Sequence, residues 1–266
     1  MPVLVPEPAV PFMTAFYLKF LITPMLMLAI SLAAKRWGTK IGGLLSGLPV
    51  TSALVILFLS LEQGAGFALQ AVPGALAGLA AVQMTYLFYF LVTRRVSAFI
   101  GCVAALAVYA ASAWLMSLLG WLAASVAVTL LLLSLIIVVT APKADSAPAK
   151  VVPLPRWVIP MRMLTATLLL VAITASAQWL GPVASGMLAP IPVIAWPLAV
   201  FAHVQGGHQE LGAIVRGNAI GAVGVLGFYL AVKASIEQWG PLPSISAAVV
   251  LAVVATFLLA RLLDKR

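Results

Sequence analysis

The stretch GGLLSGLPV, residues 42–50, decides how the chain folds, because it interrupts an apolar run that is long enough to cross a bilayer. The run extends from Ile41 to Leu61, and this part of it contains three glycines and a proline. Proline removes a backbone hydrogen-bond donor and clashes with the preceding helical turn. The sequence therefore predicts a membrane span that is broken near its middle, at Pro49.

The composition is that of an integral membrane protein. Of 266 residues, 64% are hydrophobic and 8% are charged, and the mean hydropathy is +1.18, which leaves too little polar surface for a soluble domain of this size. The net charge of +9 comes from short basic clusters between apolar runs, so membrane lipids and not nucleic acid are the expected partners. The single cysteine, Cys102, excludes an internal disulfide. No motif indicates a cofactor.

Charge-poor runs of membrane-spanning length recur along the chain and predict an all-α, polytopic fold. We expect nine spans, at residues 12–34, 41–61, 67–92, 98–119, 121–141, 160–180, 183–203, 211–232 and 243–262. Basic residues follow the first, third, fifth and ninth spans, whereas the opposite junctions carry few. Since basic loops stay in the cytoplasm, the N-terminus is expected outside and the C-terminus inside a bacterial-type inner (plasma) membrane.

The chain also contains an internal repeat. Sliding the sequence by 143 residues places Pro49 on Pro192, and residues 38–87 then give 13 identities in 50 pairs, against about five expected by chance. The shift covers five spans, and an odd number inverts the second copy in the membrane. We therefore expect two inverted four-helix repeats, at 12–120 and 160–262, joined by a bridging helix at 121–141 and a cytoplasmic linker at 142–159.

The broken spans predict a central site. Pro49 interrupts the second span, and Pro190 with Pro192 interrupts the seventh. Polar backbone freed by such a break cannot face lipid, and matching breaks in two inverted halves are typical of a transporter's binding site. A kink that serves packing alone is the alternative. The residues expected at the breaks are Ser46, Pro49, Thr51, Ser52, Pro190 and Pro192.

Basic residues inside the spans suggest an anionic substrate, because charge in a membrane is costly. Lys19 lies within the first span, and Arg216 lies beside Asn218 in the eighth. We expect these three residues to bind the substrate, with snorkelling to the interface as the alternative. Arg162 is the repeat mate of Lys19, but it lies near the start of its span, and we expect its side chain to snorkel.

Polar residues gather where the seventh and eighth spans meet. His203, His208 and Glu210 lie there, and Glu62 occupies the corresponding junction of the first repeat. Histidine and partly buried glutamate can titrate near neutral pH, so we expect these four residues to carry a coupling proton. An ordinary polar loop is the alternative. The spacing fits no metalloprotease helix, and we expect no metal site.

Two glycine pairs occupy matching positions in the two repeats. Gly74 and Gly78 lie in the third span, and Gly217 and Gly221 lie in the eighth. Glycines at this spacing let membrane helices approach closely. We therefore expect two symmetry-related helix contacts and not a dimer interface.

These features favour a secondary transporter of a small, anionic solute that works by alternating access. Paired intramembrane carboxylates, HExxH, GxSxG and nucleotide fingerprints are all missing from the sequence, so we expect no enzyme. A flippase for a lipid-linked phosphate, a membrane-embedded enzyme and a non-catalytic assembly protein are the alternatives. In its duplicated, Gly/Pro-broken spans the chain resembles inverted-repeat transporters of the bile-acid/sodium symporter superfamily, although nine spans depart from the usual ten.

Overall fold

The computed structural model describes residues 12–120, 122–141, 157–193 and 195–264. Within these ranges the chain forms eight α-helices and no strand. Six of them, α3 to α8, are long and apolar enough to cross a membrane, so the all-α, multi-pass membrane fold is confirmed at this level. The helices are α1 (Phe12–Ser46), α2 (Val50–Gln63), α3 (Ala65–Val92), α4 (Ala98–Leu119), α5 (Leu122–Val139), α6 (Val158–Leu188), α7 (Ala195–Trp239) and α8 (Pro241–Asp264).

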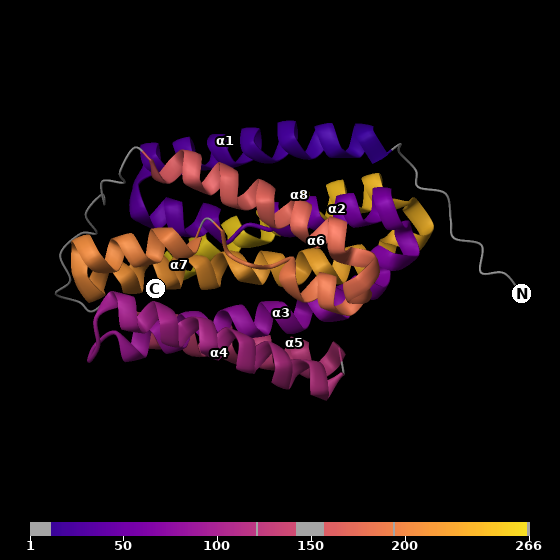
Figure 1. Cartoon of the computed structure of the whole chain (residues 1–266). Coiled ribbons are helices and arrows are strands. Elements are labelled where there is room, and N and C mark those ends of the chain that lie inside the picture. The colour runs from indigo at the N-terminus through magenta and orange to yellow at the C-terminus, as the bar shows by residue number, and fades with distance from the viewer. Residues whose placement is uncertain (1–11, 121, 142–156, 194, 265–266) are drawn as a thin grey trace, which may run out of the picture.

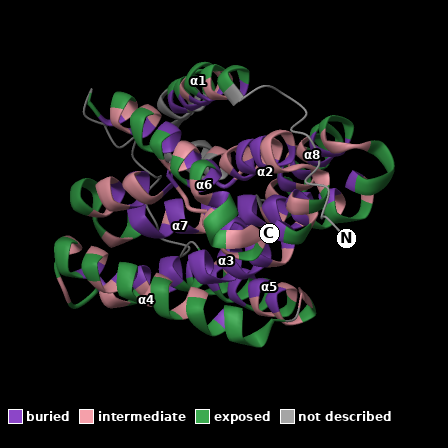
Figure 2. Ribbon diagram, turned by 45° about the vertical axis from the view of Figure 1, so that its right-hand side comes forward, coloured by how far each residue is buried: buried purple, intermediate pink, exposed green. Residues whose placement is uncertain are grey.

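The helices lie side by side in a bundle (Figure 1). α1 lies along one edge, α4 and α5 lie along the opposite edge, and α3 and α7 run between them. Most of α3 is buried, whereas α4 presents large apolar side chains such as Phe99 and Trp114 to the outside (Figure 2). An exposed apolar helix face of this kind suits a lipid environment. α3 and α7 therefore form the centre of the bundle, and α4 belongs to its lipid-facing side.

Both predicted proline breaks are present. α1 ends at Ser46, and α2 begins at Val50 with Pro49 as its N-cap residue. α6 ends at Leu188 and α7 begins at Ala195, so Pro190 and Pro192 lie in the non-helical segment between them. Because proline cannot donate the hydrogen bond that would continue the preceding helix, the chain breaks at these residues in both halves.

The structure describes eight helices where nine spans were expected, because the chain joins several of the predicted spans. α1 continues beyond the predicted first span into residues 41–46. α6 and α7 each join two helical segments across a kink at a residue with non-helical backbone angles, Gly181 and Gly207, and both kinks lie between predicted spans.

Two glycines at matching positions turn the chain in the same way. Gly64, between α2 and α3, has φ 90° and ψ 162°, and Gly207, within α7, has φ 76° and ψ −167°. The two residues are 143 apart, which is the repeat offset. A side chain is disfavoured at such a positive φ, so both turns require glycine.

The close helix contacts predicted at Gly74, Gly78 and Gly221 are also present. A Cβ placed on Gly78 of α3 would collide with the backbone of Met187 in α6, and Gly74 packs on α6 in the same way. On the other side, a Cβ on Gly47 would lie 2.8 Å from Cα of Gly221 in α7. α3 thus packs on α6 as α1 packs on α7. The glycines allow this backbone-to-backbone packing.

Candidate functional site

The two broken segments meet inside the bundle. Val50, at the start of α2, belongs to the same apolar cluster as Ile191 and Val193 between α6 and α7. Thr51 and Ala189 line one small cavity of about 10 Å³, which has room for a single water molecule at most. Residues of the two breaks therefore share one interior location, although they are far apart in sequence.

A larger cavity of about 360 Å³ lies beside the second break. Its volume is in the range of small-molecule sites. Three residues of the break, Ile191, Pro192 and Val193, form one wall together with Trp196 of α7, and the rest of the lining is almost entirely apolar. The side chains that complete it come from α3, α4 and α6 and include Val82, Thr85, Tyr86, Leu106, Tyr109, Met161, Thr165 and Leu169.

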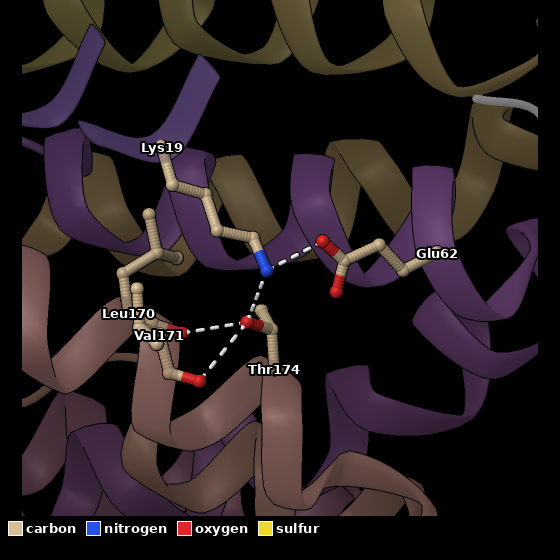
Figure 3. A network of polar contacts seen from close by, with 5 residues as sticks. All are labelled: Lys19, Glu62, Leu170, Val171 and Thr174. Atoms are coloured by element: carbon tan, nitrogen blue, oxygen red, sulfur yellow. Dashed lines mark hydrogen bonds and ion pairs between the residues drawn. The ribbon is translucent and has the colours of Figure 1, made fainter. Parts of the chain in front are cut away.

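Lys19 is buried in a polar network that joins α1, α2 and α6 (Figure 3). Its Nζ forms an ion pair with Glu62 and donates a hydrogen bond of 2.6 Å to Oγ1 of Thr174. Thr174 in turn donates to the carbonyl oxygen of Leu170 at 2.9 Å. The Nζ atom also lies 5.5 Å from the ring centroid of Phe58. Lys19 thus has an internal counter-ion, because the carboxylate of Glu62 balances its charge.

Arg162 differs sharply from its repeat mate. It has no exposed surface, so the expectation that it snorkels to the interface is wrong. Its Nε, Nη1 and Nη2 atoms have no hydrogen-bond partner within the described parts of the chain, and the hydroxyl of Tyr86 also has none. The two groups are close enough to interact electrostatically. A buried guanidinium and a phenol therefore lie near each other with unused donors.

Arg216 and Asn218 lie close in sequence but have different surroundings. The Arg216 guanidinium donates a hydrogen bond to the carbonyl oxygen of Ile137 in α5. Asn218 is buried, its side-chain oxygen has no hydrogen-bond partner within the described ranges, and its backbone carbonyl lies beside Gly47 at the first break. Arg216 therefore contacts α5, whereas Asn218 lies beside the broken segment.

The remaining residues expected at the breaks have different degrees of access. Pro49 and Pro190 are buried, and Ser52 is 2% exposed. Pro192 is the one proline among the expected residues that lines the larger cavity. The side chain of Ser46 lies outside the described residues. The open volume is thus found at the second break and not among the hydroxyl groups of the first.

The residues expected to carry a coupling proton separate into two places. Nδ1 of His203 lies 3.1 Å from the hydroxyl of Tyr89, and Nε2 of His208 lies 2.8 Å from a backbone carbonyl oxygen near the end of α3. Glu210 is buried in α7, whereas Glu62 pairs with Lys19. In the described residues, no group of three or more His, Cys, Asp and Glu side chains is arranged to hold a metal ion.

Aromatic residues of the larger cavity were not among the expected site residues. The Tyr86 and Trp196 ring centroids are 5.5 Å apart, and the Tyr109 hydroxyl donates to the carbonyl oxygen of Met187 at 3.2 Å. The sequence contains one signal for them, because Tyr86 matches Tyr229 in the repeat. The other residues come together only through packing of distant helices.

Comparison with known protein families, with curated proteins and with solved structures finds no match for this chain. Its composition and six long apolar helices identify it as a multi-pass membrane protein. What it does has to be inferred from the geometry of the breaks and from the buried charges around them.

Proposed function

We propose that the protein is a secondary transporter of a small anionic solute and works by alternating access between two inverted halves. The observation that carries the proposal is the meeting of the two proline-broken segments at one interior location. Broken helices at membrane depth are tolerated where the freed backbone is buried in protein or lines a cavity, and transporters bind their substrates at such sites. The likeness to inverted-repeat transporters is part of this proposal.

The buried cations support an anionic substrate. Lys19 and Arg162 each lie one helical turn before a residue, Thr23 or Ala166, that lines the small cavity at the breaks. The charge of Lys19 is balanced by Glu62, whereas the guanidinium of Arg162 has no hydrogen-bond partner in the described part of the molecule. Arg162 therefore carries a positive charge beside the breaks that no hydrogen-bonded carboxylate of the described residues balances, which favours an anion at this place. Proton coupling through Glu62, or through the histidines of α7, belongs to the same proposal.

The inverted arrangement is supported by matching geometry in the two halves. Gly64 and Gly207 have nearly the same backbone angles, and α1 packs on α7 as α3 packs on α6. Cysteines introduced at Gly66 and Gln205 in a Cys102→Ala background test the inversion. A membrane-impermeant thiol reagent is expected to modify them from opposite sides of the membrane. Modification of both from one side would exclude the inverted repeat.

A flippase for a lipid-linked phosphate is the second candidate. The larger cavity has Leu106 of α4 at its wall, and this residue is 66% exposed on the apolar outer surface. A lipid can therefore reach the cavity from the side. An embedded enzyme or an assembly protein would need no matching breaks in both halves, so these two alternatives are less well supported.

Flux measurements on the full chain in proteoliposomes test the transport proposal. Acetate, decanoate and inorganic phosphate serve as probes, and empty liposomes serve as the control. We expect protein-dependent flux of at least one anion and a several-fold loss in Pro49→Ala and Pro192→Ala, because a restored backbone hydrogen bond removes groups that the site uses. Pro73→Ala, a proline of α3 outside the breaks, is the matched control and should keep the flux. No flux for any probe would count against transport of small anions.

A further inference from the structure

We propose that Arg162 binds the anionic head group of an amphiphilic ligand, whose apolar part occupies the cavity beside the second break. The proposal assigns a ligand class to the cavity beside the second break. It rests on the proposed function only for the claim that the ligand is transported. Binding and transport are measured separately, so either can fail alone.

Arg162 lies on the flank of α6 that forms the cavity wall. Thr165 and Leu169 follow it at helical spacings of three and seven residues, and both line the cavity. Residues at these spacings share one face of a helix. The charge of Arg162 also acts on Tyr86, which lines the cavity from α3. Arg162 is not itself a lining residue, but Met161 before it is, so Arg162 lies beside this wall of the cavity.

The donors at this position are unused. None of the three guanidinium nitrogens of Arg162 has a hydrogen-bond partner within the residues described, and neither does the Tyr86 hydroxyl. A guanidinium presents a planar fork of N–H donors that matches a carboxylate or a phosphate. Such charge-assisted bonds are among the strongest hydrogen bonds in proteins. One oxyanion that accepts hydrogen bonds from both side chains would satisfy the buried donors.

Comparison with Lys19 shows what Arg162 lacks. Lys19 pairs with Glu62, and the repeat offset of 143 residues places Gln205 where a matching carboxylate would stand. Gln205 is exposed and carries no charge. A buried cation without a counter-ion is costly in a membrane protein. Lys19 thus has an internal negative charge, whereas the described residues provide none in contact with Arg162, and we infer that a ligand supplies it.

The shape of the cavity favours a ligand with an apolar part. Its volume is about 360 Å³ and its lining is almost entirely apolar. Leu106 at its wall lies on the outer face of α4, where Phe99 and Val103 are 78% and 56% exposed (Figure 2). A small inorganic anion would leave most of this volume unfilled, and an uncharged lipid would leave Arg162 without a partner. An amphiphilic anion that enters from the bilayer satisfies both requirements.

Quenching of Trp196 fluorescence tests the proposal, because this side chain lines the cavity. The probe is 11-bromoundecanoate, whose bromine quenches indole fluorescence on contact, and its uncharged methyl ester is the control ligand. We expect the acid to quench at lower concentration than the ester, and the saturable part of the quenching to disappear in Trp196→Phe. Arg162→Gln should raise the half-quenching concentration of the acid by about tenfold or more, as expected for a lost charged hydrogen bond.

Two further arginine variants separate ligand binding by Arg162 from a loss of folding. Arg36→Gln, at an exposed arginine of α1, is the matched control and should leave the half-quenching concentration unchanged. If Arg162→Gln does not fold, Arg162→Lys keeps the charge but loses the planar fork, and it should still weaken binding of the acid. Equal quenching by acid and ester, or an unchanged half-quenching concentration in the Arg162 variant, would overturn the proposal.

Two sources of the ligand are distinguished in vesicles. Quenching of Trp196 by brominated phosphatidylglycerol but not by brominated phosphatidylcholine would identify a lipid head group, whereas quenching by the free acid alone would identify a soluble amphiphile. Either result supports the proposal when it depends on Arg162, and the absence of both contradicts it. Binding without flux would leave the ligand site intact and exclude the transport proposal.

Discussion

Removing the carboxylate of Glu62 should destabilise the protein, because it leaves the ammonium of Lys19 buried without its counter-ion. The two side chains are 10% and 4% exposed, so solvent screens the pair only weakly. Breaking a buried ion pair by removing one partner costs about 3–5 kcal/mol. Since the hydrogen bond of Lys19 to Thr174 remains at 2.6 Å, we expect Glu62→Gln to lose about 3 kcal/mol, near the lower end of that range.

A double-mutant cycle separates the pair from its surroundings. Unfolding by sodium dodecyl sulfate, followed by tryptophan fluorescence, gives the free energy of unfolding for Glu62→Gln, Lys19→Met and the double variant. The double variant removes both charges together and should be close to the unchanged protein in stability. The reasoning is refuted if each single variant loses less than about 1 kcal/mol, or if the double variant loses the sum of both.

Substitutions at Gly78 and Gly207 can be tested by the same unfolding measurement. Gly78→Leu should lower the free energy of unfolding by about 1–3 kcal/mol or more, because its side chain would collide with the backbone of α6. Gly66→Leu, at a position with open space around it, is the control and should leave the free energy of unfolding unchanged. Equal losses in the two variants would contradict the close contact. Gly207→Ala should cost about 1–3 kcal/mol because its φ is 76°, whereas Gly227→Ala, in the helical part of α7 with nothing within 4 Å, should be neutral or stabilising. No difference between the last two variants would mean that the turn at Gly207 does not require glycine.

The helix breaks could be predicted from the sequence because their cause is partly local. Pro49 and Pro192 lie at breaks because proline lacks the backbone donor, but Pro24 and Pro73 lie inside α1 and α3, so tertiary packing decides which prolines end a helix. The kinks at Gly181 and Gly207 depend on packing too, since glycine is also found inside continuous helices such as α3. Its choice of a positive φ depends on how neighbouring helices pack. The predicted boundaries at 180–183 and 203–211 enclose these two kinks, whereas the continuation of α1 to Ser46 was not predicted.

The partners of the buried charges could not be predicted, because they come from distant parts of the chain. Lys19 and Thr174 are 155 residues apart, and no local pattern connects them. The position of Arg162 near the start of an apolar run suggested an exposed side chain, but in the packed bundle it is fully buried. The repeat did show that Lys19 and Arg162 occupy corresponding positions, 143 residues apart. It did not reveal that, within the described residues, Lys19 has a carboxylate partner and Arg162 has none.

Accessibility of the two breaks from both sides of the membrane tests alternating access most directly. Thr51→Cys and Ile191→Cys, each made in a Cys102→Ala background, place one thiol at each break. Right-side-out and inside-out vesicles are treated with a membrane-impermeant thiol reagent, and the rate of modification is measured in each. The account predicts that both cysteines react from both sides, because the site opens to each side in turn. Reaction from one side only would contradict it.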